Sequence, residues 1–248
     1  MKKIATTGTN RKETMNFKQI TVIGCGGIWS YLWKPMARLL EHTKGAPKRL
    51  ALVDGDHFTP SNAVRQDMID ADLMRNKAAV YVERFAVEFP QVKVSVIPEF
   101  VTKKNIEQLI PEGTLVLSCV DNHATRRLIA EHARKLKNCT VITGASDMTA
   151  GNVHVQIIEN GEIQTKGIDE THDEVKNGKD RNPGELSCEE RAKLPGGGQQ
   201  MVANVMTASI MSVAMWKLMS GEEIIPQSEV FYDLKHMAMD SSGRSAVK

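Results

Sequence analysis

The stretch Gln19-Ile20-Thr21-Val22-Ile23-Gly24-Cys25-Gly26-Gly27-Ile28-Trp29-Ser30 decides the fold of this chain. A short apolar run ends in a glycine-rich turn, and a helical pattern follows the turn. This order predicts a buried strand joined tightly to a helix N-terminus. Glycines let backbone amides approach a phosphate, and the helix N-terminus carries positive partial charge. We therefore expect Gly24, Gly26 and Gly27 to contact a nucleotide, which the turn alone does not identify as NAD, FAD or ATP.

Further apolar runs and helical patterns alternate along the first 143 residues. The other runs, rich in β-branched residues, occupy 50–53, 92–97, 115–120 and 140–143, and the helical patterns occupy 29–40, 75–89, 103–110 and 124–136. Continuous apolar runs are typical of parallel strands that are covered on both faces. The sequence therefore predicts an α/β fold: a Rossmann-like, doubly wound, mostly parallel sheet with helices on both faces.

The remainder of the chain has a different pattern. Residues 152–158 alternate in polarity and 159–162 form a turn signal, which predicts an antiparallel hairpin that extends the sheet. A polar segment at 165–198 is too long for an ordinary connection and is expected to be a functional or partner-ordered crossover loop. A Met-rich helix at 199–219 is expected in the core or at a subunit interface. We thus predict a flexible arm at 1–16, one domain at 17–238 and a tail at 239–248.

Composition limits the classes of function. The chain has 248 residues, with 32 Lys and Arg against 30 Asp and Glu. This near balance disfavours nucleic acid as the main ligand. We find no apolar stretch near the roughly 20 residues that cross a bilayer and no signal-peptide pattern at the start, so we expect a cytoplasmic protein without membrane contact.

The four cysteines do not suggest a metal site. Cys25, Cys119, Cys139 and Cys188 include no Cys-x-x-Cys pair, so we expect neither a structural zinc nor a disulfide framework. The first three lie in apolar surroundings, where a cysteine acts as a small buried hydrophobe.

Polar residues after the second and fourth predicted strands favour ATP. Asp54 stands where doubly wound folds place an acid that binds ribose hydroxyls. Arg65 and Lys77 suit a polyphosphate tail, which a dinucleotide lacks, so an oxidoreductase is disfavoured. Asp121 is suited to hold Mg²⁺ on phosphate oxygens. The candidate nucleotide-binding residues here are Asp54, Asp56, Ser61, Asn62, Arg65, Gln66, Lys77, Asp121 and Asn122.

Three of these segments resemble one family. The segments 52–56, 61–66 with Lys77, and 118–122 are similar to the second-strand, Ser-Asn-x-x-Arg-Gln and Asp-Asn motifs of the ubiquitin-activating-enzyme-like family, which includes the ThiF, MoeB and HesA adenylyltransferases. Order and spacing agree over roughly residues 17–160. The resemblance implies that 17–238 is a ThiF-type adenylation domain that binds ATP and Mg²⁺.

The resemblance also implies a reaction, a partner and residue roles. The C-terminal carboxylate of a ubiquitin-like or sulfur-carrier protein ending in glycine attacks the α-phosphorus of ATP and releases pyrophosphate. In the transferred roles Gly27 contacts the nucleotide, Asp54 contacts the ribose, and Asp121 holds magnesium. Asn62, Arg65 and Lys77 contact the phosphates. The catalytic set is then Arg65, Lys77 and Asp121, and a homodimer is expected.

Cys188 lies in the polar crossover, where thioester-forming family members keep their cysteine. Two readings stay open: a nucleophile that receives the activated acyl group as a thioester, and an incidental thiol. Arg191 and Lys193 favour the thiolate, whereas Glu189 and Glu190 oppose it.

Two residues depart from the expected pattern, and other functions stay open. Trp29 replaces the glycine that usually completes the family turn, and we expect it to narrow the site. Pro35 falls inside the first helical pattern, where it costs about 3 kcal/mol unless a kink absorbs it. One alternative is a non-catalytic or nucleotide-sensing subunit of an activating-enzyme dimer. Another is activation of a small-molecule or tRNA-bound carboxylate.

Overall fold

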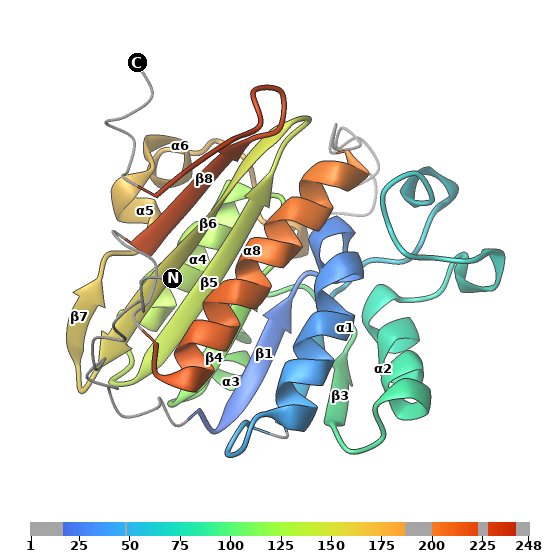
Figure 1. The fold of residues 1–248 in the computed structure, drawn as a ribbon, viewed down its shortest axis with the longest axis horizontal. Coiled ribbons are helices and arrows are strands. Elements are labelled where there is room, and N and C mark those ends of the chain that lie inside the picture. Colours follow the sequence, from blue (N-terminus) through green and yellow to red (C-terminus); the bar gives the residue numbers. More distant parts are fainter. Residues whose placement is uncertain (1–16, 48, 187–199, 223–227, 242–248) are drawn as a thin grey trace, which may run out of the picture.

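The computed structural model describes residues 17–47, 49–186, 200–222 and 228–241. Within these residues the strands form one nine-stranded sheet with the order β3-β2-β1-β4-β5-β6-β8-β9, and β7 pairs with β6 (Figure 1). The strands are β1 Gln19–Ile23, β2 Arg49–Val53, β3 Lys93–Ile97, β4 Thr114–Ser118, β5 Cys139–Ser146, β6 Ala150–Glu159, β7 Glu162–Thr165, β8 Glu229–Asp233 and β9 Ala238–Asp240.

Helices connect the parallel strands and follow the hairpin. The α-helices are α1 Gly27–His42, α2 Lys77–Glu88, α3 Ile106–Leu109, α4 His123–Ala133, α5 Ile168–Thr171, α6 Asp173–Lys176 and α8 Met201–Ser220. Three short 3₁₀ helices are η1 Pro60–Asn62, η2 Asp70–Asp72 and η3 Pro183–Glu185.

The sheet topology confirms the predicted doubly wound fold. Strands β1 to β5 are parallel and lie in the order 3-2-1-4-5. β6 and β7 pair antiparallel, as the hairpin signal predicted, and β8 and β9 extend the antiparallel part of the sheet beyond that signal. The strand order reverses between β1 and β4, and open α/β sheets bind ligands at the carboxyl ends of the strands at such a point.

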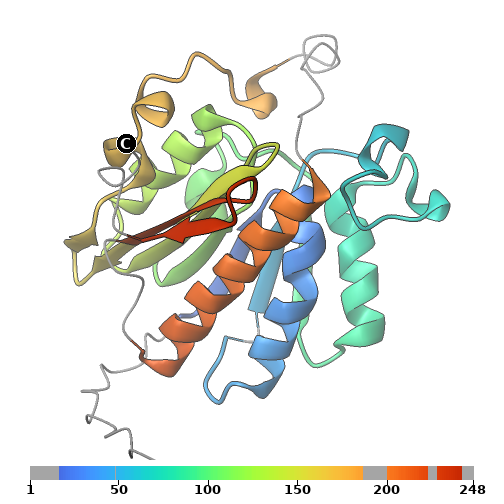
Figure 2. The ribbon, with the colours of Figure 1, turned by 45° about the horizontal axis from the view of Figure 1, so that its top comes forward.

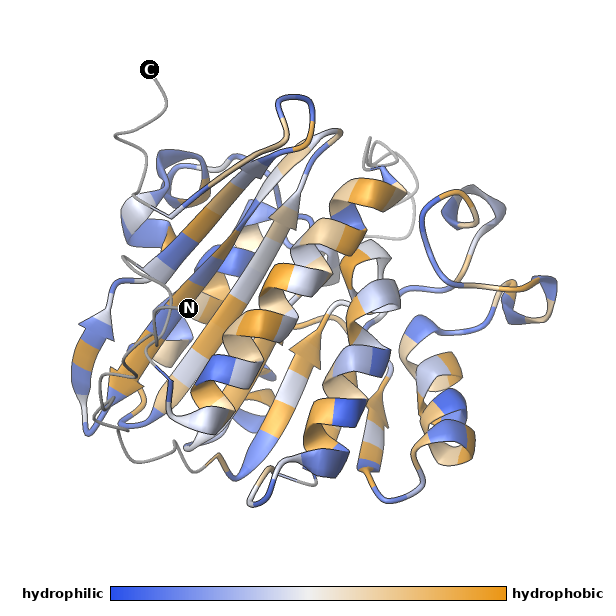
Figure 3. Ribbon diagram, viewed as in Figure 1, coloured by the Kyte–Doolittle hydropathy of each residue, from blue (hydrophilic) through white to orange (hydrophobic). Residues whose placement is uncertain are grey.

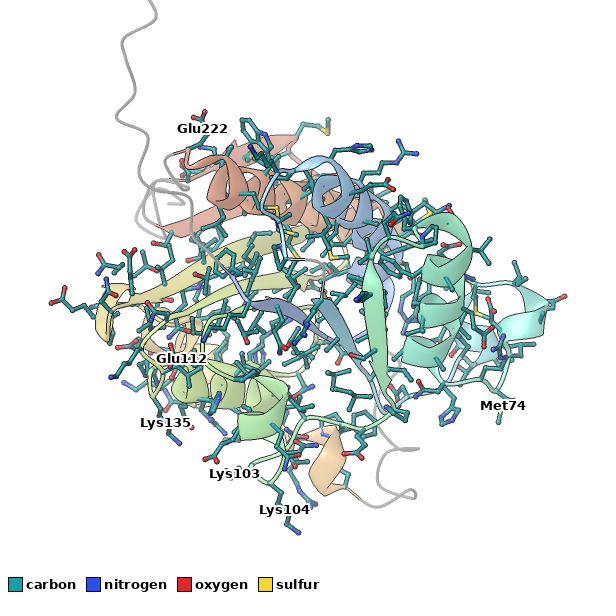
Figure 4. The ribbon with its side chains drawn as sticks, turned by 90° about the horizontal axis from the view of Figure 1, so that it is seen from below. Met74, Lys103, Lys104, Glu112, Lys135 and Glu222 are labelled. Atoms are coloured by element: carbon teal, nitrogen blue, oxygen red, sulfur yellow. The ribbon has the colours of Figure 1, made fainter. Side chains whose placement is uncertain are left out.

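Helices cover both faces of the sheet. Side chains of α1, α2 and α8 share one buried cluster with Ile20 and Val22 of β1. Side chains of α3 and α4 share another with Ile23. The alternation of β1 explains this division, because successive side chains of a strand point to opposite faces. In Figure 4, Glu222 just after α8 and Lys135 just after α4 lie on opposite sides of the sheet.

Two predicted elements on the β3 side differ from expectation. β3 is the edge strand, and its side chains are exposed or half-buried, with Val96 41% exposed. Coverage of this run is therefore less complete than predicted, with Val94 packed partly against one core cluster and Ile97 partly against the other. The helix expected at 103–110 is shorter than predicted, because α3 is a single turn. Elsewhere, helix α1 continues unbroken through the exposed Pro35.

Helix α8 is mostly apolar, with Lys217 as its one charged residue, and hydrophobic residues prevail on the side seen in Figure 3. By length and composition it could cross a membrane, a feature that the sequence reading did not recognise. Half of its most apolar window is buried, and Met211 and Met215 are fully enclosed. The helix lies beside α1 and against β5 (Figures 1 and 2). Part of α8 thus belongs to the core, one of the two placements that the methionine pattern predicted, and a subunit interface on its exposed side stays a prediction.

Two other segments lie at the margins of the fold. The chain between β2 and α2 projects from the body, with the exposed Met74 at its outer edge (Figures 2 and 4). At the other end of the sheet, β9 includes Met239 and Asp240. The predicted boundary of the tail at residue 239 was therefore too early, because this short strand pairs with β8.

Candidate functional site

A cavity of about 280 Å³ lies at the carboxyl ends of β1, β2 and β4. The predicted nucleotide-binding residues meet here, although they come from five separate segments. Those that line the cavity are Gly24, Gly26, Gly27, Asp54, Asp56, Ser61, Asn62, Arg65, Gln66, Lys77, Asp121 and Asn122. The chain thus assembles one polar pocket at the point where the strand order reverses.

The glycine turn forms the floor of this pocket. Gly24 has a φ of +92°, and a Cβ there would lie 2.9 Å from the carbonyl oxygen of Cys119. Both observations require glycine at this position. Gly26 is the N-cap of α1 and supplies no capping side chain. The N-terminus of α1 therefore presents its amides to the pocket, and such a terminus attracts anions.

Asp54 anchors the turn to the second strand. Its Oδ2 accepts a hydrogen bond of 2.6 Å from the amide of Cys25, and its Oδ1 accepts one of 2.8 Å from the amide of Asp56. Burial raises the pKa of Asp54, and the nearby Lys77 ammonium opposes that rise. This anchoring was not foreseen from the sequence, and the contact of the same carboxylate with a ribose stays a prediction.

Lys77 is a nearly buried cation at the start of α2. Its Nζ lies 3.5 Å from Oδ2 of Asp56, and its side chain is 9% exposed. Asn76 caps α2 by accepting from the amide of Ala79, and its Nδ2 donates 2.8 Å to the carbonyl of Asp54. The sequence reading missed Asn76, although Asn immediately before a helical pattern is a recognised capping signal.

Helix η1 and the turn after it supply the other polar groups. Asn62 is buried, and its Oδ1 accepts a hydrogen bond of 3.0 Å from the amide of Thr59. Arg65 donates 3.1 Å to the carbonyl of Ser61 and forms no ion pair within the described residues. Gln66 is buried, and its Oε1 has no hydrogen-bond partner in that same part of the chain. These groups leave the pocket wall with unused hydrogen-bonding capacity.

Asp121 and Asn122 have different structural roles. Asn122 caps α4, because its Oδ1 accepts a hydrogen bond of 2.8 Å from the amide of Thr125. Asp121 is exposed and lines the pocket. Across the described ranges, three or more His, Cys, Asp or Glu side chains nowhere gather as metal ligands do. Asp121 therefore contributes one carboxylate to a wall that also includes Asp54, Asp56 and Glu99.

Trp29 does not narrow the pocket, so that expectation was wrong. The side chain is fully buried and packs between α1 and α2, with its ring 6.3 Å from that of Phe85 and 5.9 Å from that of Tyr81. It lies among the hydrophobic core residues and does not line the cavity. Close packing beside the turn involves Gly27 instead, where a Cβ would lie 2.2 Å from Nδ2 of Asn204 in α8.

Part of the long crossover also reaches the pocket. Oδ2 of Asp180 accepts a hydrogen bond of 2.5 Å from the amide of His123 at the start of α4. This bond holds the segment so that Asn182 and Pro183 line the cavity, as do Glu99 and Phe100. No motif in the sequence pointed to these four residues. Cys188, predicted in the same crossover, lies outside the described residues.

The other three cysteines are buried, as predicted. Burial raises the pKa of the Cys25 and Cys119 thiols, and it raises the pKa of the Cys139 thiol to about 12. A thiol with a raised pKa is a poor nucleophile at neutral pH. These three side chains thus have a packing role.

Comparison with known proteins supports the fold and the family. The ThiF family matches residues 1–246. Two curated relatives are the tRNA threonylcarbamoyladenosine dehydratase of Escherichia coli, 27% identical over 142 residues, and the adenylyltransferase and sulfurtransferase UBA4 of Eremothecium gossypii, 25% identical over 159 residues. The matches cover 56% and 62% of this chain, but 51% and 34% of those proteins. The chain thus spans about half or less of each relative.

Two solved structures share the fold of this chain at a lower sequence identity than the curated relatives. E. coli MccB with ATP superposes with a TM-score of 0.68 at 14% identity, covering 95% of this chain and 67% of that one. PaaA superposes with a TM-score of 0.66 at 18% identity, covering 93% and 65%. At these identities the likeness establishes the fold alone.

Proposed function

Because this chain belongs to the ThiF family, we propose that it uses ATP to adenylate a carboxylate, namely the C-terminal carboxylate of a ubiquitin-like or sulfur-carrier protein. The observation that carries this proposal is the pocket itself. It combines an open helix N-terminus, the cations Arg65 and Lys77, and the exposed carboxylate of Asp121 at the switch point of the sheet. Phosphoryl chemistry is catalysed chiefly by such positioning and charge neutralisation.

The pocket fits a nucleoside triphosphate in its polar groups. The N-terminus of α1 and the Lys77 ammonium suit phosphate oxygens, and the unpartnered Oε1 of Gln66 suits a hydrogen-bond donor of the ligand. Asp54 would accept from ribose hydroxyls. Arg65, which forms no ion pair within the described residues, would complete the phosphate contacts.

Asp121 can supply one carboxylate ligand to a magnesium ion. Mg²⁺ commonly takes one or two protein carboxylates and completes its shell with phosphates and water, so one carboxylate on the wall suffices. A bound Mg²⁺ supplies charge neutralisation at the phosphates. The residues of the chain then hold the α-phosphate near the carboxylate. A carboxylate oxygen attacks phosphorus, the bond to the bridging oxygen breaks, and pyrophosphate leaves.

A second acceptor is a carboxylate carried by tRNA. The observation that favours it is the similarity to a tRNA threonylcarbamoyladenosine dehydratase. The near balance of charged residues gives no additional support for nucleic acid. We also keep Cys188 as the proposed acceptor of the acyl group and a cytoplasmic homodimer as the proposed assembly.

ATP–pyrophosphate exchange tests the proposal. We expect exchange that requires a carrier protein ending in Gly-Gly, and a fall of about 10²-fold or more in Asp121→Ala, as for loss of a charge-stabilising group. Asp70→Ala, which removes a carboxylate in η2 that does not line the pocket, is the matched control. Unchanged exchange in Asp121→Ala would refute the magnesium role. Exchange that requires tRNA instead of the carrier would favour the second acceptor.

A further inference from the structure

Residues 180–184 of the crossover form a strap beside the nucleotide pocket, and both ends of the strap are fixed. At one end, Oδ2 of Asp180 accepts hydrogen bonds from the first amides of α4. At the other end, Gly184 packs so closely on the segment after β3 that a Cβ there would lie 2.8 Å from Cβ of Phe100. The strap thus connects the start of α4 with the end of β3, and Asn182 between these ends lines the cavity.

Asn182 is a buried side chain with a fixed orientation. It is 4% exposed, and its Oδ1 accepts a hydrogen bond of 2.8 Å from the amide of Gly184. A backbone amide can only donate, so this bond determines which terminal atom of the side chain is oxygen and which is nitrogen. Nδ2 has no hydrogen-bond partner in the described part of the chain. The donor group on Nδ2 is therefore what Asn182 can still offer to a ligand.

A buried amide nitrogen without a partner lowers stability, because it has lost its hydrogen bonds to water and gained none in return. Most buried polar groups in folded proteins do have a partner. An exception on the wall of a binding cavity indicates that a ligand supplies the missing partner. Because Nδ2 donates, the ligand atom that it contacts must be a hydrogen-bond acceptor.

The position of Asn182 in the fold indicates which part of a nucleotide it meets. The N-terminus of α1 and Lys77 of α2, which suit the phosphates, belong to helices on one face of the sheet. The strap is fixed to α4, which packs on the other face. Doubly wound folds bind phosphates at the helix N-terminus and the ribose at the acid after the second strand, here Asp54. The base then lies beyond the ribose, on the side of the strap.

The cavity wall near Asn182 suits the faces of a base. Phe100 and Val101 follow β3, and both line the cavity. The ring of Phe100 lies against the backbone of Gly55, because a Cβ at Gly55 would lie 2.5 Å from Cδ2 of that ring. Gly55 directly follows Asp54, so this apolar wall begins next to the acid that is proposed to bind the ribose. Apolar walls cover the faces of a ligand, and a few polar groups fix its orientation.

We propose that Asn182 donates a hydrogen bond from Nδ2 to a ring nitrogen of the adenine of ATP, so that the crossover takes part in recognising the base. The acceptors that an adenine ring offers are N1, N3 and N7. This inference rests on the proposed use of ATP. It adds a specificity-determining residue from a segment that contains none of the sequence motifs of the pocket.

Calorimetry with analogues of ATP tests this hydrogen bond. In three analogues a C–H group replaces N1, N3 or N7 in turn, which removes one acceptor and nearly preserves the shape of the ring. We expect the native protein to bind one of the three at least about 5-fold more weakly than ATP, as for a buried donor that loses its partner. That analogue identifies the acceptor atom.

Asn182→Asp assigns the effect to this side chain. Aspartate keeps an oxygen for the Gly184 amide but has no nitrogen donor, so the affinity ratio between ATP and the weak analogue should fall to about one. The added negative charge acts on both nucleotides alike and cancels in this ratio. Asn177→Asp is the matched control, because Asn177 is exposed in the same crossover and does not line the cavity. It should keep the native ratio.

If Asn182→Asp does not fold, Asn182→Ala replaces it, with the same expected loss of the ratio. Equal binding of ATP and all three analogues to the native protein would overturn the inference, as would a native ratio in the folded variant. A merely structural role of Asn182 predicts the latter result, with every nucleotide bound more weakly. A native protein that binds no ATP refutes the proposed function and the inference with it, whereas ATP binding with an unchanged ratio refutes only the role of Asn182.

Discussion

Adding one methyl group at Gly27 should destabilise the fold through a single contact. The Cβ of Gly27→Ala would lie 2.2 Å from Nδ2 and 2.9 Å from Cγ of Asn204, which is fully buried. Asn204 cannot turn away freely, because its Oδ1 accepts 2.7 Å from Oγ of Ser146. Overpacking costs about 1–3 kcal/mol. Loss of the Ser146 hydrogen bond adds about 1 kcal/mol. We expect a total of about 2–4 kcal/mol.

Thermal unfolding of four proteins measures this interaction. For a chain of this size the expected loss lowers Tm by roughly 5–15 °C in Gly27→Ala. In an Asn204→Ala background the same substitution meets no amide and should cost little or even stabilise, since alanine is a better helix residue than glycine. The double-mutant cycle therefore predicts a coupling of about 2 kcal/mol or more. Equal losses in both backgrounds would show that the contact with Asn204 is not the cause.

Two further predictions concern buried aromatic and histidine side chains. Trp29→Phe should lower the free energy of unfolding by about 1–2 kcal/mol through a cavity between α1 and α2, yet leave ATP affinity unchanged, because Trp29 does not line the pocket. Weaker ATP binding in a folded Trp29→Phe would contradict this placement. Burial lowers the pKa of His154 to about 4 from 6.5, so the unfolded chain binds this proton first as pH falls. The stability that the neutral histidine contributes is present above pH 6.5 and is lost between 6.5 and 4, a loss of about 3 kcal/mol. Urea unfolding of His154→Gln at pH 7 and pH 4.5 should show a smaller loss than the native protein, and equal losses would contradict the shift.

The parallel half of the fold was predictable because its signals are local. Apolar runs of β-branched residues predicted β1, β2, β4 and β5, and the glycine turn predicted the joint between β1 and α1. The exposure of β3 was not predictable in this way. Whether a run such as 93–97 is an edge strand depends on sheet order, which only long-range packing determines.

The candidate site was predictable where the residues belong to motifs. Asp54, Arg65, Lys77 and Asp121 all line one pocket. Residues from distant segments escaped the sequence reading. Asn182 and Pro183 line the same pocket, yet they come from the long crossover and belong to no motif, so only the fold shows that they lie there.

Trp29 is a residue for which the sequence predicted an effect on the site that the structure does not show. Its position in the turn suggested a narrowed site, because a glycine there allows close packing between helix and strand. In the structure the indole occupies the space between α1 and α2, beside Tyr81 and Phe85. The direction of a side chain from a helix start depends on the neighbouring helix, which the motif does not specify.

Transfer of oxygen from the acid to AMP tests the proposed adenylation most directly. A carrier protein whose C-terminal carboxylate contains ¹⁸O is incubated with ATP, Mg²⁺ and hydroxylamine, which attacks the acyl carbon and releases AMP. If a carboxylate oxygen attacks the α-phosphorus, the bond that breaks next leaves that ¹⁸O on phosphorus, and ³¹P NMR detects labelled AMP together with pyrophosphate. AMP without the label, or ADP and phosphate as the products, would contradict carboxylate adenylation in this pocket.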